Sequence, residues 1–350
     1  MKKFCLFCVA LVSVLILTFS PAHADPQAPD DTGRFTATEE NDYFVSKDDR
    51  HYTQGARISY LSGAVTPGND WDAPYRWLDG NLPVVFESGP SVKRKYDVML
   101  GQSLFTPKNL VAATAPKIDR PYAGWLYTGA ELLQDSDEGS HHTLENLEAD
   151  IGVVGPAAFG SFTQNDYHQF IGVNPAAGWH NQLHNEPGLV LSYEKKWRFG
   201  TPVLGDGYGI DVIPEAGATG GNIFTYAETS GLVRFGKNLN ADYGPTHIRP
   251  SLSGTDWFDK NQMKGDLGWY FFAGLQGRAV ARNIFLDGNT FESSPSVNKR
   301  PLVGDFVGGA SLFWTDAVRI DFTYIERTKE FYGQAGTDDK YGGINLAFRL

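Results

Sequence analysis

The feature that most constrains the fold is a strict two-residue alternation of side-chain types that recurs along the chain. In residues 318–324, apolar Val, Ile, Phe and Tyr alternate with Arg, Asp and Thr, and residues 147–153 and 344–350 repeat the pattern. Successive side chains of a β-strand point to opposite faces, so each segment predicts a strand with one apolar face and one polar or small face.

Twelve segments show this alternation, an even number, and each is near the roughly 9–11 residues that a tilted transmembrane strand needs. Charged side chains on the second face would strongly destabilise the strand if that face contacted lipid, but they are acceptable if it faces a water-filled lumen. We therefore predict an all-β fold over residues 34–350, a twelve-stranded antiparallel transmembrane β-barrel of the bacterial outer membrane. The predicted strands are 34–42, 52–62, 94–104, 121–134, 144–154, 188–199, 209–218, 222–235, 266–278, 302–314, 317–328 and 340–350.

A secreted soluble β-protein, such as a propeller or a sandwich, would show similar alternation. Two observations also count against a barrel. Connectors 63–93 and 236–265 are long where periplasmic turns should be short, and the chain ends on Phe348-Arg349-Leu350 rather than on an aromatic residue. Neither observation suggests a better fold.

Residues 1–24 have the pattern of a secretory signal peptide. Lys2 and Lys3 precede a short apolar run, and Ala22-His23-Ala24 fits the small-x-small cleavage rule. We expect the mature chain to start near Asp25, with 25–33 as a flexible leader. Both cysteines lie in the segment to be removed, so the mature chain would have no thiol and no disulfide.

Charge and motifs exclude several functions. Loss of the two signal lysines changes the formal net charge from -11 to -13, which disfavours nucleic-acid binding. The sequence has no G-x-S-x-G elbow, no H-E-x-x-H, no P-loop and no cysteine nucleophile. A serine hydrolase stays open, although no serine has a local setting that nominates it.

The predicted topology gathers unusual residues at one end of the barrel. With the N-terminus in the periplasm, odd strands run outward, so connectors 43–51, 105–120, 155–187 and 329–339 face the exterior. A hairpin between the first two strands would crowd its polar residues into one small volume. The residues expected at or above the outward strand ends are Asn41, Asp42, Thr53, Lys108, Asp119, Arg120, Gln164 and His168.

Gln164 and His168 are four residues apart, which on a helical turn places both side chains on one face. A histidine in such a loop can be a general base, a metal ligand or a solvated side chain. The histidine type alone discriminates little. The competing histidines are His141, His142, His180, His184 and His247.

Asp42 is a candidate ligand of a hard cation, joined by Asn41, by backbone carbonyls and by water. The alternative is that the pair caps a strand or forms an Asx turn. Lys108 could neutralise an anionic substrate group or simply be solvated, and Thr53 alone is nearly uninformative. These residue types favour a water-activating histidine with a cation partner.

Several stretches together resemble the outer-membrane lipid A 3′-O-deacylase family, calcium-dependent barrels of twelve strands. They occur in order and cover most of the mature chain. The matching stretches are Asn41-Asp42, Tyr52-Thr53-Gln54-Gly55, GQSLFTP at 101–107, DRPYAGWLYTGAEL at 119–132, DIGVVGP at 150–156, QNDYHQFIG at 164–172 and PEAGATGGNIFTY at 214–226.

The resemblance implies that His168 deprotonates a water for attack on an ester carbonyl, with Ca²⁺ polarising that carbonyl. It implies site roles for Asn41, Asp42 and Thr53, a matching position for Gln164, and a looser match for Lys108. Two departures stand out. Asn174 occupies the position of an expected glutamate six residues after the histidine, and the first outward connector is shorter.

The resemblance thus implies a lipid A deacylase at the outer leaflet that hydrolyses the 3′-linked acyloxyacyl ester. Lipid A or lipopolysaccharide would be the substrate, outer-membrane lipids would surround the barrel, and no obligate protein partner is expected. Two rival readings remain: an outer-membrane phospholipase-like esterase, and a non-enzymatic porin or structural barrel with only solvated loop ends at the rim.

Overall fold

The computed structural model describes residues 30–46, 50–82, 85–86, 91–112, 118–172, 174–202, 205, 207–250, 256–314 and 317–349. The predicted signal peptide 1–24 and residues 25–29 of the predicted leader lie outside this part. The last residues of that leader contact the barrel. Asp30 is buried, and its Oδ2 accepts a hydrogen bond from Lys95 Nζ at 2.8 Å.

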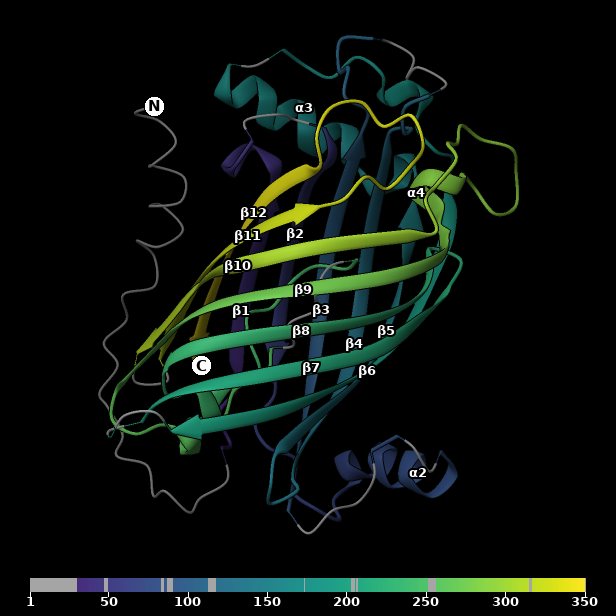
Figure 1. Ribbon diagram of the computed structural model, residues 1–350. Helices are drawn as coiled ribbons and strands as arrows, with labels where there is room; N and C mark the ends of the chain where they lie inside the picture. Colours follow the sequence, from purple (N-terminus) through teal and green to yellow (C-terminus); the bar gives the residue numbers. More distant parts are fainter. Residues whose placement is uncertain are drawn as a thin grey trace.

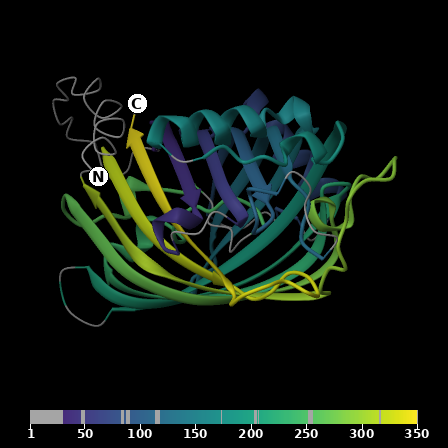
Figure 2. The same ribbon diagram turned by 90° about the horizontal axis from the view of Figure 1, so that it is seen from above.

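Twelve antiparallel strands form a closed barrel in which each strand pairs with its neighbours in sequence and β1 pairs with β12 (Figures 1 and 2). The predicted fold is confirmed. The strands are β1 (Arg34–Asn41), β2 (His51–Leu61), β3 (Val92–Thr106), β4 (Ala123–Asp137), β5 (His142–Val154), β6 (Glu186–Pro202), β7 (Tyr208–Gly221), β8 (Phe224–Lys237), β9 (Leu267–Asn283), β10 (Leu302–Trp314), β11 (Val318–Arg327) and β12 (Asp339–Arg349).

Every predicted strand overlaps an observed one. The largest difference is at the end of β9, predicted at residue 278 and observed at Asn283. Several strands exceed the expected length, because polar residues at their ends continue the ladder beyond the apolar segment: β6 and β9 have 17 residues each.

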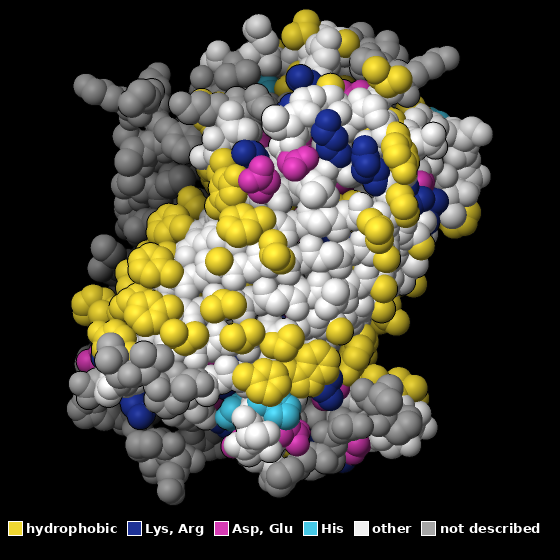
Figure 3. All heavy atoms as spheres, viewed as in Figure 1, with side chains coloured by type: hydrophobic (Ala, Val, Ile, Leu, Met, Phe, Trp, Pro, Cys, Tyr) yellow, Lys and Arg dark blue, Asp and Glu magenta, His cyan; other side chains and the backbone are white. Residues whose placement is uncertain are grey.

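The alternation separates an apolar outer face from a charged inner face. Leu191 on β6, Phe271 and Leu275 on β9 and Phe322 on β11 are exposed on the outside. Figure 3 shows hydrophobic side chains over this wall, with charged side chains gathered toward its ends. An outer surface of this kind suits lipid, where every backbone polar group must be satisfied within the closed sheet.

Short helices occupy the connectors, and none of those described is both long enough and apolar enough to cross a membrane. Helix α2 lies at the end of the barrel opposite α3 (Figure 1). The helices are η1 (Asp42–Phe44), η2 (Asp70–Asp72), α2 (Ala73–Asn81), η3 (Pro156–Ala158), α3 (Gly160–Ile171), η4 (Trp179–Asn181), η5 (Leu239–Ala241), η6 (Lys260–Gln262) and α4 (Ile284–Asp287).

The long connector between β8 and β9 enters the barrel. We call residues 238–250 and 256–266 the luminal segment. Ile248 N–H donates to Glu40 Oε1 on β1 at 3.1 Å, and Arg249 Nη2 donates to Glu148 Oε2 on β5 at 2.8 Å. Asn345 Nδ2 on β12 donates to Thr246 O at 2.7 Å. The unusual length of this connector is therefore used to fill the lumen.

Candidate active site

The candidate residues all lie at the end of the barrel where β1 ends and β2 begins, which we call the rim. Figures 1 and 2 show α3 across this end, above the wall formed by the first strands. The backbone O of Ala158, just before α3, accepts from Gln102 Nε2 on β3 at 2.6 Å.

Asn41 and Asp42 take different local roles. Asn41 caps η1, because its Oδ1 accepts from Tyr43 N–H at 2.9 Å. Asp42 is buried, and its Oδ2 accepts from the backbone N–H of Arg50 across the connector at 2.6 Å. The capping alternative therefore describes Asn41, whereas the Asp42 carboxylate is fixed by the far side of the hairpin.

Thr53 lies at an irregularity of β2, where the register with β3 shifts between Tyr52 and Gln54. Its hydroxyl is buried and lies 2.7 Å from Thr106 Oγ1, at the end of β3. Lys108 follows two residues later and is exposed, with its backbone N–H donating to Asp119 Oδ2 at 2.9 Å. Its ammonium group therefore faces solvent at the rim.

Gln164 anchors α3 to the loop that follows it. Its Oε1 accepts from Trp179 Nε1 at 2.7 Å, and both side chains are buried. The indole packs on the Tyr122 ring with centroids 5.1 Å apart. Gly160 opens the helix where a Cβ would lie 2.6 Å from Trp179, so only glycine permits this close approach.

His168 lies in the last turn of α3 with 5% of its surface exposed. Its Nδ1 is 3.0 Å from the backbone O of Asn174. A carbonyl oxygen only accepts hydrogen bonds, so we assign the proton to Nδ1, which makes Nε2 the basic nitrogen of the neutral ring. Asn174, at the position of the expected glutamate, thus orients the histidine through its main chain.

The candidates form two groups at the rim. Asn41, Asp42 and Thr53 belong to the first hairpin, and Gln164 and His168 belong to α3. The loop after β3 bridges from the strands toward the helix, because Leu110 O accepts from Ala177 N–H at 2.8 Å beside Trp179. Loops far apart in sequence therefore share one packed unit at the rim.

His51 is a rim residue that was not predicted from the sequence. It is fully buried at the start of β2, with a left-handed φ of 65° that non-glycine residues rarely adopt. Its Nδ1 lies 2.7 Å from Asp339 Oδ1, and its Nε2 lies 3.5 Å from Asp119 Oδ1. Gln334 Nε2 donates to Asp339 Oδ2 at 2.8 Å. The only local signal was its place beside Thr53 in the first hairpin.

This network joins three rim connectors electrostatically. Burial alone would raise the pKa of Asp119, but the nearby His51 imidazole and the hydrogen bond from Lys108 N–H hold that pKa below its usual value. Burial likewise opposes ionisation of Glu330, yet Arg120, whose Nη1 donates to Glu330 Oε2 at 3.0 Å, lowers the pKa of that carboxyl. Both carboxylates are therefore charged parts of the rim at neutral pH.

Comparison with known proteins agrees with this architecture. A family model described as "Outer membrane protein LpxR" matches residues 9–350. The structure of LpxR from Salmonella typhimurium superposes with a TM-score of 0.69 at 23% identity, covering 90% of this chain and 99% of that one.

Two other outer-membrane barrels match more distantly. The β domain of the Bordetella autotransporter BrkA has a TM-score of 0.38 at 8% identity, covering 91% of this chain and 97% of its own. An outer membrane channel from Pseudomonas putida F1 has a TM-score of 0.39 at 10% identity, covering 95% and 100%. A search of curated protein sequences found no match.

Proposed function

The chain belongs to the LpxR family of outer-membrane lipid A deacylases, and we propose that it hydrolyses the 3′-linked acyloxyacyl ester of lipid A at its rim. His168 is the proposed general base. The observation that carries this assignment is the contact between His168 Nδ1 and Asn174 O, because it leaves Nε2 as the basic nitrogen on a helix fixed by Gln164 and Trp179.

In the proposed reaction, Nε2 of His168 takes a proton from water as the water oxygen attacks the ester carbonyl carbon. The tetrahedral species then expels the sugar 3′ oxygen, which receives the proton from the imidazolium. The products are the free acyloxyacyl acid and a 3′-hydroxyl. Gln164 acts as a positioning residue, since its Oε1 holds α3 against Trp179.

We propose that Asn41 and Asp42 bind Ca²⁺. The donors here are oxygens, as calcium prefers, and the backbone N–H of Arg50 holds the Asp42 carboxylate in place at the rim. Bound calcium would polarise the ester carbonyl and stabilise the charge that develops on its oxygen. Thr53 would orient substrate through its hydroxyl, and the exposed ammonium of Lys108 would face a lipid A phosphate.

The porin reading is disfavoured by the luminal segment. Arg249 is held by Glu148 on β5, and Arg319 on β11 donates to the carboxylate of Asp242 in the segment. Because these contacts reach opposite walls, the described segment obstructs the lumen. The family assignment also favours lipid A over a phospholipid as the substrate.

The test is His168→Ala in the purified, refolded protein, with release of acyl chains from lipid A as the readout. A positioned general base contributes typically 10²–10⁴-fold, so we expect a rate loss of that size. His184→Ala is the matched control, since His184 is in the same connector but half exposed, 3.1 Å from Glu292. Equal losses at both positions would show that the base is misassigned.

A further inference from the structure

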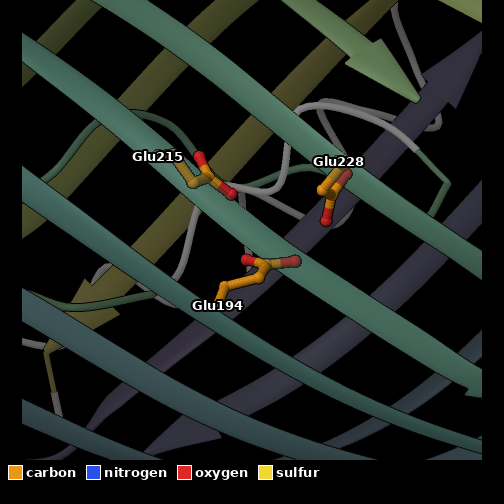
Figure 4. A group of neighbouring side chains, drawn as sticks. All are labelled: Glu194, Glu215 and Glu228. Carbon is orange, nitrogen blue, oxygen red and sulfur yellow. The ribbon is translucent and has the colours of Figure 1, made fainter. Parts of the chain in front are cut away.

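Three glutamates face one another inside the barrel wall, away from the rim site (Figure 4). Glu194 lies on β6, Glu215 on β7 and Glu228 on β8, and all three are buried. One carboxylate oxygen from each lies within 4.8 Å of the others. A cluster of carboxylates alone does not make a cation site, so a second, independent feature of the surroundings must also point to a bound cation.

A glycine on β7 separates two of these glutamates in the sheet. Gly217 on β7 pairs with Glu194 on one side and with Glu228 on the other. A Cβ at position 217 would lie 2.7 Å from Cγ of Glu194. The glycine therefore lets two acidic side chains approach across the strand that separates them.

Two cations contact this group of glutamates. Arg249 of the luminal segment pairs with Glu194 and also donates to Glu148. The Nζ of Lys196 lies 3.8 Å from Glu215 Oε2. Arg249 is thus shared between Glu148 and the glutamate group.

Glu228 provides a second and independent observation. Its side chain is only 1% exposed, and its Oε2 accepts from Gln276 Nε2. Its Oε1 accepts no hydrogen bond from the described part of the chain, and Arg249 Nη1 is 3.9 Å away. A buried carboxylate oxygen without a donor is costly unless a cation or a proton occupies its lone pairs.

We propose that Glu194, Glu215 and Glu228 bind one divalent cation inside the barrel, with Ca²⁺ preferred. Calcium accepts many oxygen ligands in flexible geometry, whereas magnesium demands near-ideal octahedral geometry and keeps several of its waters. Three carboxylates fixed on three different strands therefore suit calcium better.

The cation would fasten the luminal segment. Arg249 bridges Glu148 on β5 and Glu194 on β6, so neutralising the glutamate group keeps Arg249 paired with both of these neighbouring strands. Binding of this kind is linked to folding, because the three carboxylates come together only when β6, β7 and β8 are paired. This site is independent of the proposed catalytic calcium and of the deacylase reaction.

The test counts tightly bound metal in the Asp42→Asn protein, in which the proposed rim site is weakened by loss of its negative charge. The chain is refolded from urea into detergent with Ca²⁺, desalted and analysed by mass spectrometry for calcium per chain. We expect one tightly bound equivalent. Adding Glu228→Gln, which preserves shape, should reduce this to none, whereas adding Glu131→Gln should not change it. Glu131 is the matched control, because it is buried in the lumen and bonded by Asn146.

Heat modifiability on gels checks that each variant is folded. If Asp42→Asn and its Glu131→Gln derivative bind no calcium, or if Glu228→Gln retains the full equivalent, the proposal is wrong and protons neutralise the group. Should Glu228→Gln fail to fold, the Asp42→Asn protein alone decides. Its urea midpoint must rise with Ca²⁺ more than with Mg²⁺, and equal midpoints without metal and with either ion would overturn the site.

Discussion

Trp179→Phe tests how α3 is held over the barrel. The change keeps an aromatic ring against Tyr122 but removes the indole N–H that donates to Gln164 Oε1 at 2.7 Å. Losing the donor to a buried neutral acceptor costs about 1–3 kcal/mol. Since 1.4 kcal/mol corresponds to a factor of ten, docking of α3 should weaken by roughly 5- to 150-fold.

The assay is amide hydrogen exchange across Gly160–Ile171, combined with the deacylation rate. Exchange protection should fall by the full factor, because exchange reports the opening free energy of the helix. The deacylation rate should fall less, because it depends on the fraction of molecules in which α3 is docked. That fraction changes little until undocked molecules become common. Trp77→Phe, in the exposed face of α2 at the opposite end, is the control and should change neither quantity. Unchanged protection of α3 in Trp179→Phe would refute the anchoring role.

Two further outcomes are expected at the rim. Asp42→Asn, which keeps an oxygen but loses the charge, should raise the calcium midpoint of lipid A hydrolysis, with partial rescue at high calcium; full wild-type activity in excess chelator would refute the metal role. The pKa values of Asp119 and Glu330 are lower in the folded protein than in the unfolded chain, so the unfolded chain binds more protons in acid. The stability that these two carboxylates contribute is therefore complete above their unfolded pKa values of 3.8 and 4.5. That stability is lost as the pH falls through their pKa values in the folded protein. Exchange protection of the rim connectors should therefore fall below about pH 4, and Asp119→Asn should reduce it at neutral pH while flattening its pH dependence; an identical profile in that variant would contradict the reasoning.

Local pattern was enough to predict the barrel. Each strand carries its own alternation, and a closed antiparallel barrel pairs strands in sequence order, so no long-range information was needed. The luminal segment was not predicted, because its contacts are specific partners on distant strands. Arg249 pairs with Glu148, which lies 101 residues away in the sequence. Nothing in the sequence around either residue distinguishes it from a charged residue exposed to solvent.

The candidate site was predicted unevenly for the same reason. Gln164 and His168 share a helix face, so their spacing was informative. Nothing local indicates that Trp179 holds Gln164, or that the backbone of Asn174 orients the histidine. The ion pair of His51 with Asp339 spans 288 residues and forms only because β2 and β12 flank β1 in the closed barrel.

The most direct measurement is mass spectrometry of lipid A from cells that express the wild-type chain, the His168→Ala variant or neither. The wild type should convert lipid A to a species lacking the whole 3′-linked acyloxyacyl group, with both phosphates retained. The His168→Ala cells should match cells without the protein, although the variant barrel is present in the outer membrane at the same level. Unmodified lipid A in wild-type cells whose purified protein also fails to release acyl chains from lipid A with calcium, or full deacylation by His168→Ala, would contradict the account.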